Sequence, residues 1–193
     1  SYAAMEAVHQ EAYSLLLETL GKSDDMYQEF FDIHAMMEKH EYLQDFSMKT
    51  PFDMAKTMAV YSAFTEGVQL FSSFAILLNY PRHNLMKGMG QIVTWSIRDE
   101  SLHVEGLSKL FRTFMQENPE LWTDKLKYEI YCAAEKTVEL EDNFIDICFD
   151  KADVPDLTAK EVKEYIRYIA DRRLLGIGMK AIFHSTENPL PWI

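Results

Sequence analysis

The sequence predicts an all-α protein whose 193 residues form a single domain, residues 1–193. Glycine and proline, the two residues that most often interrupt helices, number only 7 and 6. No segment alternates polar and apolar residues for more than a few positions, as a half-buried strand would. A chain of this length usually forms one domain, and 48% hydrophobic residues are enough for a sizeable core.

The first fifty residues predict two helices. Residues 1–20 form the first, and Gly21 is the kind of residue that commonly ends a helix. The second begins at Ser23-Asp24-Asp25, whose side chains can cap a helix, and runs to about His40. Residues 41–50 are then a polar connection.

Prolines mark the limits of the next two helices. A long third helix is predicted over residues 51–79, because Pro51 suits a first helical turn. The turn 79–82 leads into a fourth helix, about residues 83–116, which Asn118-Pro119 ends.

Two more helices complete the predicted bundle. The fifth covers about residues 119–150 and is followed by a loop. The sixth, about residues 158–175, begins with Thr158 and Glu161 at the spacing of a capping box. The proline-containing tail, residues 188–193, is not expected to be helical.

Charge and composition exclude several classes of protein. The net charge of −12 argues against a nucleic-acid-binding surface, which is usually basic. The longest apolar stretch, around residues 74–78, is far too short to span a membrane, and the N-terminus lacks the features of a signal peptide. Cys132 and Cys148 form no zinc or redox motif and predict two small buried side chains in a reducing compartment. We therefore expect a cytoplasmic protein without nucleic-acid or membrane partners.

Two copies of Glu-x-x-His are the most informative feature of the chain: Glu6-Ala7-Val8-His9 and Glu100-Ser101-Leu102-His103. Residues i and i+3 share a helix face, so each pair can direct a carboxylate and an imidazole at one point. Two such helices, joined by one carboxylate from each of two others, form the dinuclear metal site of ferritin-like bundles. Carboxylates with imidazoles suit iron and manganese, whereas thiolates would indicate zinc or iron–sulfur clusters. The sequence therefore predicts a ferritin-like helical bundle with a dinuclear metal–carboxylate site.

Glu66 is the candidate ligand on the third helix. It lies among Phe64, Leu70 and Phe71, and a carboxylate that faces an aromatic core is costly unless it is paired, protonated or bound to metal. Taken alone, Glu66 reads as a surface residue. The two Glu-x-x-His helices reverse that interpretation.

Asp99 and Tyr13 each allow two interpretations. Asp99 could orient His9 or His103 through the far ring nitrogen, or form a solvated pair with Arg98. Tyr13 lies one turn after His9 on the same face and is either a core tyrosine or a redox-active tyrosine beside the metals. The remaining histidines have no carboxylate three residues before them and are expected at surface or packing positions: His34, His40, His83 and His184.

Taken in order along the chain, these segments closely resemble the small, radical-generating subunit of class I ribonucleotide reductase. The resemblance spans nearly all 193 residues. The matching stretches are Glu6-x-x-His9-x-x-x-Tyr13, Glu66 followed by Phe71 and Phe74, Arg98-Asp99-Glu100-Ser101-Leu102-His103, residues 168–174 and Asn188-Pro189-Leu190-Pro191-Trp192.

The resemblance implies a role for each candidate residue. Tyr13 would be the radical tyrosine, and Asp99 would hydrogen-bond a ligating histidine and belong to the radical-transfer path. The cofactor would be two iron ions, with two manganese ions or a mixed pair as alternatives. The partners would be the large catalytic subunit, which reduces ribonucleotides, and a second copy in a homodimer. The metal ligands would be Glu6, His9, Glu66, Glu100 and His103.

The family pattern also includes a sixth ligand before Glu6 and a C-terminal tail that docks on the large subunit. We therefore expect the chain to be an internal piece of a longer protein, truncated at both ends and inactive alone. Two other functions remain open at this point. One is a ferritin-like di-metal oxidase or oxygenase acting on its own substrate, and the other is an iron-binding helical bundle without radical chemistry.

Overall fold

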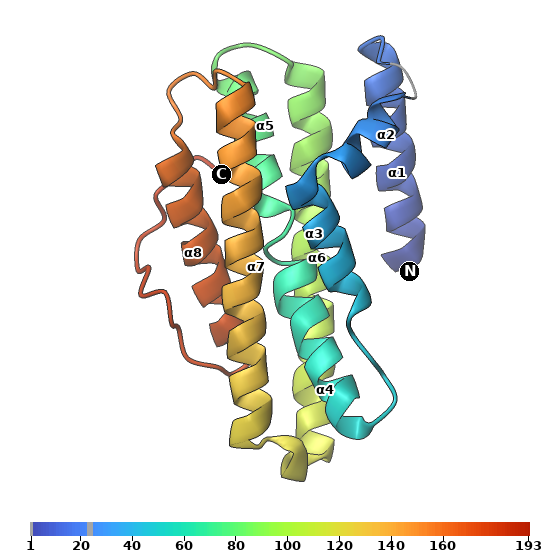
Figure 1. Cartoon of the computed structure of the whole chain (residues 1–193), viewed down its shortest axis with the longest axis vertical. Helices are drawn as coiled ribbons and strands as arrows, with labels where there is room; N and C mark the ends of the chain where they lie inside the picture. The colour runs from blue at the N-terminus through green and yellow to red at the C-terminus, as the bar shows by residue number, and fades with distance from the viewer. Residues whose placement is uncertain (1, 23–24) are drawn as a thin grey trace.

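The structure, a computed structural model, describes residues 2–22 and 25–193 and contains only helices and connections among them. This confirms the predicted all-α class. Figure 1 shows the helices as a bundle. Their bounds are α1 Tyr2–Thr19, α2 Asp25–Asp32, α3 His34–Gln44, α4 Pro51–Val60, the π-helix η1 Tyr61–Thr65, α5 Phe71–Arg82, α6 Lys87–Glu117, the 3-10 helix η2 Pro119–Leu121, α7 Asp124–Lys151 and α8 Ala159–Gly176.

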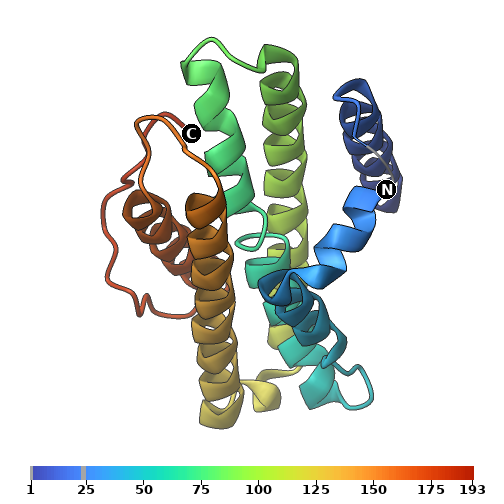
Figure 2. The ribbon, with the colours of Figure 1, turned by 45° about the horizontal axis from the view of Figure 1, so that its top comes forward.

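Two long helices organise the bundle. α6 packs against α1, α4 and α5, and α7 packs against α3, α4 and α8. α1 lies at the edge of the bundle beside α6, on the side away from α7 and α8 (Figure 1, Figure 2). Large side chains from α6, α7 and α8, such as Phe111, Ile130 and Ile166, are fully buried and join the segments into one core.

Several helix ends follow from local sequence. Gly21 has a φ of +68°, the left-handed conformation that glycine adopts readily at a helix end. α4 begins at Pro51, and Thr50 forms a capping box with Asp53. α8 begins with the predicted capping box of Thr158 and Glu161. The predicted cap at Ser23-Asp24 lies outside the described residues.

The second and third predicted helices are each interrupted in the structure, so the prediction of one continuous helix is wrong in both cases. Residue Ile33 has extended backbone angles, and it separates α2 from α3. The predicted helix 51–79 is interrupted by η1 and by a turn at residues 66–70, after which α5 continues. The interruption is stabilised by side chains far away in the sequence, which local helix preference cannot reveal.

Several further boundaries differ from prediction. α3 continues to Gln44, into the predicted connection 41–50, and α6 begins at Lys87 rather than near residue 83. Pro81 lies inside α5 rather than in a turn, and α5 ends one residue later at Arg82. The fifth helix begins at Asp124 because residues 119–121 form a 3-10 turn. Thr123 then caps α7 by accepting the backbone N–H of Leu126 at 3.2 Å.

No helix in the described part of the chain combines the length and the apolar composition needed to cross a membrane. Cys132 and Cys148 are both free and lie half-buried rather than in the deep core.

Candidate metal centre

The two Glu-x-x-His pairs face each other across the contact between α1 and α6. Glu6 and His9 come from α1, and Glu100 and His103 come from α6. The helical i,i+3 spacing places each carboxylate beside its own imidazole, as the sequence predicted. Glu66 adds a third segment, because it directly follows η1.

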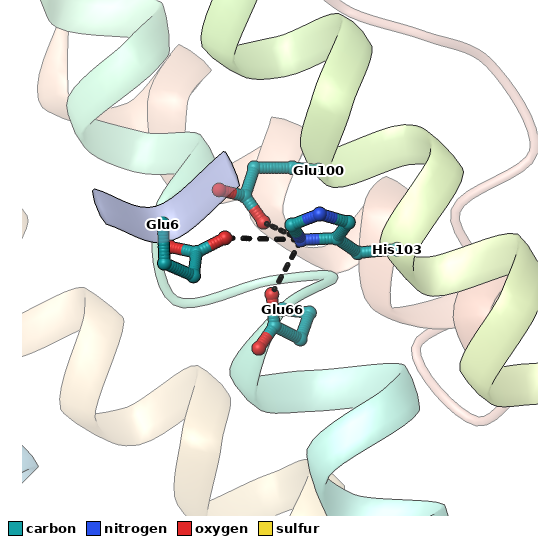
Figure 3. Close-up of side chains that lie close together, drawn as sticks. All are labelled: Glu6, Glu66, Glu100 and His103. Atoms are coloured by element: carbon teal, nitrogen blue, oxygen red, sulfur yellow. Dashed lines mark ion pairs between the residues drawn. The ribbon is translucent and has the colours of Figure 1, made fainter. Parts of the chain in front are cut away.

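Three carboxylates converge on His103, whose side chain is only 2% exposed. Its Nδ1 lies 3.2 Å from Glu6 Oε1, 3.5 Å from Glu66 Oε2 and 3.4 Å from Glu100 Oε2 (Figure 3). One candidate ligand atom from each of these four residues lies within 4.8 Å of the other three. A single ring nitrogen can donate to only one acceptor at a time, so this crowding of acceptors suits a shared cation.

His9 lies on the other side of the same carboxylates. Its Nδ1 is 3.6 Å from Glu6 Oε2 and 3.4 Å from Glu100 Oε1. Glu6 and Glu100 therefore each direct one oxygen toward His9 and the other toward His103. The centroids of the two imidazole rings are 6.4 Å apart. One group of possible ligand atoms contains Glu6, Glu66, Glu100 and His103, and His9 lies beside that group, next to Glu6 and Glu100.

The electrostatics of the cluster favour a cation. Burial raises the pKa of Glu100 to about 8, and a hydrogen bond with Glu66 and the negative charges of Glu66, Glu6 and Asp99 add to the shift. Among the described residues, Glu100 Oε2 and His103 Nε2 are buried without a hydrogen-bond partner. Buried acceptors and crowded carboxylates are costly unless a positive charge compensates them. The donor set therefore fits a divalent metal ion.

The π-helix explains how Glu66 reaches the cluster. The backbone N–H of Glu66 donates to Tyr61 O at 3.1 Å, a bond across five residues rather than four. The wider turn shifts the following residues relative to a regular α-helix, and such turns are frequent at functional sites. Without this shift, the carboxylate of Glu66 would take a different direction from the helix.

Asp99 contacts His9 rather than His103. Its Oδ2 is 3.3 Å from His9 Nε2, while its Oδ1 accepts from Arg98 Nε at 3.3 Å and Nη2 at 3.2 Å. The two interpretations from the sequence therefore both describe real contacts. A carboxylate on the far ring nitrogen fixes the tautomer in which His9 Nδ1 is free to face the cluster.

Tyr13 is half-buried and joins α1 to α6. Its hydroxyl donates to Ser96 Oγ at 3.0 Å, and its ring packs against the hydrophobic core. Burial raises the pKa of Tyr13, the Ser96 hydrogen bond lowers it and the charge of Glu100 raises it. Tyr13 therefore remains a neutral phenol within electrostatic reach of the cluster.

Tyr2 is a neighbour of the site that was not among the residues predicted from the sequence. Its ring centroid lies 4.5 Å from that of His103. The Tyr2 hydroxyl occupies the place where a side chain at Gly106 would begin. Gly106 therefore allows α1 to bring the Tyr2 ring against α6. The feature of the sequence that hints at this contact is a glycine three residues after His103, on the same face of the helix.

The other histidines lie apart from the cluster. His34 is close to Glu38 at 3.7 Å on an exposed part of α3, and His40 contacts Gln44 at 2.7 Å on the same helix. His83 lies 3.9 Å from Asp156. These positions agree with the predicted surface or packing roles.

Fold and donor set together define a ferritin-like helical bundle with a carboxylate–histidine metal centre. The family model for the small chain of ribonucleotide reductase matches residues 1–189, and the chain belongs to that family.

Three relatives illustrate the match. A probable ribonucleoside-diphosphate reductase small subunit of Invertebrate iridescent virus 3 is 42% identical over 211 aligned positions, covering 100% of this chain and 56% of that protein. A Bacillus halodurans structure assigned as a class I ribonucleotide reductase has a TM-score of 0.91 and 26% identity, covering 100% of this chain and 71% of that one. The dimanganese(II) NrdF of Streptococcus sanguinis has a TM-score of 0.79 and 26% identity, covering 96% and 64%. The chain spans between 56% and 63% of the length of the first curated relatives it matches.

Proposed function

We propose that this chain carries the metal centre and the radical tyrosine of the small subunit of a class I ribonucleotide reductase. The observation that carries the proposal is the geometry of α1 and α6. Their two Glu-x-x-His pairs share Glu6 and Glu100, and Tyr13, one turn beyond His9, hydrogen-bonds α6 one turn before Glu100. Membership of the family supports the same reading.

Each residue at the site has a proposed task. Glu6 and Glu100 would each offer one carboxylate oxygen to a metal ion beside His9 and the other to one beside His103, because each directs one oxygen toward either imidazole. Asp99 holds the Nε2 hydrogen of His9, so that Nδ1 faces the metal. Ser96 Oγ accepts the hydroxyl hydrogen of Tyr13 and fixes the direction in which it points. The proposed metal ligands are Glu6, His9, Glu66, Glu100 and His103.

The proposed cofactor is a pair of iron ions, and a manganese pair or a mixed pair has the same ligand requirements. The dimanganese relative from Streptococcus sanguinis supports keeping manganese as the alternative. When bound, the metals would supply, with oxygen, the oxidising power that removes an electron from Tyr13. The chain itself supplies the ligands, the apolar surroundings of the tyrosine and the fixed position of its hydroxyl.

The proposed partners follow from the family. The large catalytic subunit would receive the radical reversibly and use it to reduce ribonucleoside diphosphates. A second copy of the small subunit would complete a homodimer.

Reconstitution tests this function. The metal-free full-length protein, of which this chain is expected to be a piece, is loaded with Fe(II), exposed to oxygen, and examined for bound iron and for a tyrosyl radical by electron paramagnetic resonance. We expect bound iron and a radical that requires Tyr13, followed by deoxynucleotide formation when the large subunit is added. Oxygen consumption without a tyrosyl radical would instead indicate a carboxylate oxidase. Iron binding without any radical or oxidase chemistry would indicate a non-radical helical bundle.

A further inference from the structure

The turn at residues 66–70 connects the π-helix to α5 and begins with the proposed ligand Glu66. Its backbone is irregular: the N–H groups of Val68 and Gln69 both donate to Phe64 O at 3.0 Å, and Phe71 donates to Val68 O at 3.0 Å. The carbonyl oxygens of Gly67 and Gln69 accept hydrogen bonds from side chains of two other helices. The path of this turn therefore depends on hydrogen-bond donors that lie far from it in the sequence.

Arg173 on α8 is the first donor. Its Nε donates to Gly67 O at 3.0 Å, and its guanidinium carbon lies 5.1 Å from the centroid of the Phe71 ring. Arg173 is partly buried, and burial lowers the pKa of its guanidinium. A Cβ at residue 67 would overlap the backbone oxygen of Ala63 and meet Arg173 Nε at 2.9 Å, so glycine suits both the path of the turn itself and the close approach of Arg173.

Lys39 on α3 is the second donor. Its Nζ donates to Gln69 O at 3.1 Å, lies 4.7 Å from the centroid of Phe144 and forms an ion pair with Glu141. Glu141 on α7 is fully buried and also accepts the hydroxyl hydrogen of Ser72, in the first turn of α5. The ion pair therefore holds both sides of the junction between the turn and α5.

Stability alone is a weak explanation for these buried charges. Burying an ion pair removes both charges from water, and well-packed apolar residues of similar volume are often as stable. What apolar residues cannot do is donate hydrogen bonds to the carbonyls of Gly67 and Gln69. Fixing the geometry of the turn is the task that specifically requires nitrogen donors here.

Glu66 is the member of the cluster that most needs such support. Glu6 and Glu100 each have a histidine three residues away on the same helix, so helix geometry alone aligns them. Glu66 has no histidine three residues away in its own segment. Its direction toward His103 therefore depends on the path of the backbone immediately after it.

We propose that Arg173 and the Lys39–Glu141 pair are positioning residues that fix the 66–70 turn and thereby direct the carboxylate of Glu66 into the metal centre. This inference rests on the proposed metal centre and adds three residues from α3, α7 and α8 that do not contact it. Supporting residues of this kind typically change metal affinity about 10–100-fold when they are removed.

The experiment measures Mn(II) binding by the metal-free protein, using the electron paramagnetic resonance signal of free Mn(II). Two variants remove the donors independently: Arg173→Met, and Lys39→Met/Glu141→Gln, which leaves no unpaired buried charge. Arg167→Met is the matched control, because Arg167 lies on α8 and pairs with Asp142 away from the turn. Glu66→Ala reports the effect of losing the ligand itself. Circular dichroism establishes that each variant is folded at the temperature of the titration.

We expect both donor variants to weaken Mn(II) binding by about tenfold or more, in the direction of Glu66→Ala, while Arg167→Met binds as the wild type does. Arg173→Lys, which keeps a nitrogen donor, should recover much of the loss. If Arg173→Met does not fold, the double variant decides the question. Folded donor variants with wild-type binding, alongside a weakened Glu66→Ala, would overturn the positioning role and leave the metal centre intact. A wild-type protein that bound no Mn(II) would overturn the metal centre itself.

Discussion

The hydroxyl of Tyr13 donates a 3.0 Å hydrogen bond to Ser96 Oγ, and so joins α1 to α6 across 83 positions of sequence. Ser96 in turn donates to Ile92 O at 3.2 Å, which leaves its oxygen free to accept from Tyr13. Glu100 follows Ser96 by one helical turn, and its charge affects the pKa of Tyr13. The tyrosine is therefore held by the helix that carries two of the five proposed metal ligands, Glu100 and His103.

Tyr13→Phe should abolish the tyrosyl radical and leave the fold nearly unchanged. The substitution removes one hydroxyl and a hydrogen bond whose net contribution to stability is about 1 kcal/mol. We expect near-normal circular dichroism and iron content, but no tyrosyl radical by electron paramagnetic resonance and no reductase activity with the large subunit. Ser96→Ala is the matched control, because it removes the same hydrogen bond and keeps the phenol. A Tyr13→Phe protein with full reductase activity would mean that the oxidising equivalent is stored elsewhere.

The raised pKa of Glu100 predicts an unusual pH dependence for the metal-free protein. An unfolded glutamate titrates near 4.5, whereas burial and its carboxylate neighbours raise the pKa of Glu100 to about 8 in the fold. Between these values the folded state binds an extra proton, so the free energy of unfolding should decrease as pH rises from about 5 to 8. Urea unfolding in the presence of a chelator measures this slope.

Glu100→Gln isolates the contribution of this carboxyl group. Glutamine cannot ionise, so the variant should lose much of the decrease in stability between pH 5 and 8. Mn(II) should reverse the trend for the wild type, because metal competes with the proton and its affinity rises with pH. An unchanged slope in Glu100→Gln would assign the pH dependence to other groups.

Asp99→Asn tests the support that His9 receives. The amide keeps the size of the side chain but removes the negative charge from the group that holds His9 Nε2 at 3.3 Å. We expect a loss of metal affinity of about 10–100-fold without loss of fold. Arg98→Gln is the control, since Arg98 is 74% exposed and contacts Asp99 from the solvent side. A gain of metal affinity in Arg98→Gln as large as the loss in Asp99→Asn would show that Asp99 acts through general charge rather than through His9.

The sequence predicted those parts of the molecule that depend on local rules. The Glu-x-x-His pairs converge because i,i+3 spacing on a long helix is sufficient to align each carboxylate with its imidazole. α8 begins at the predicted capping box, because Thr158 and Glu161 satisfy each other's backbone N–H groups without help from the rest of the chain.

The parts that were missed depend on partners far away in the sequence. The break after Thr65 is stabilised by Lys39 and Arg173, which lie 30 and 106 positions from the carbonyls they serve. Only Gly67 marked the place locally, and a glycine inside a helical pattern is compatible with an unbroken helix. The hydrogen bond from Tyr13 to Ser96 could not be predicted for the same reason. Nothing in the sequence around Ser96 indicates which residue of α1 faces it.

Asp171 offers a test of the segment that follows α8. It is buried, its Oδ1 accepts the backbone N–H groups of Ile182 at 2.9 Å and Phe183 at 3.0 Å, and its Oδ2 accepts that of Ser185 at 2.9 Å. One carboxylate thus satisfies three donors of a segment that has no helix of its own. Asp171→Ala leaves all three unpaired and should lower the free energy of unfolding by about 3 kcal/mol or more.

Two companion substitutions make the Asp171 measurement specific. Asp146→Ala removes an exposed carboxylate paired with Lys163, and should change stability by about 0–1 kcal/mol. Asp171→Asn keeps one acceptor oxygen but turns an NH₂ group toward the N–H of Ser185 or of its neighbours, so it should recover only part of the loss. Urea unfolding gives the three free energies, and hydrogen exchange at Ile182, Phe183 and Ser185 locates the effect. If Asp171→Ala lost stability without faster exchange at these amides, the carboxylate would be stabilising the core of α8 rather than the segment after it.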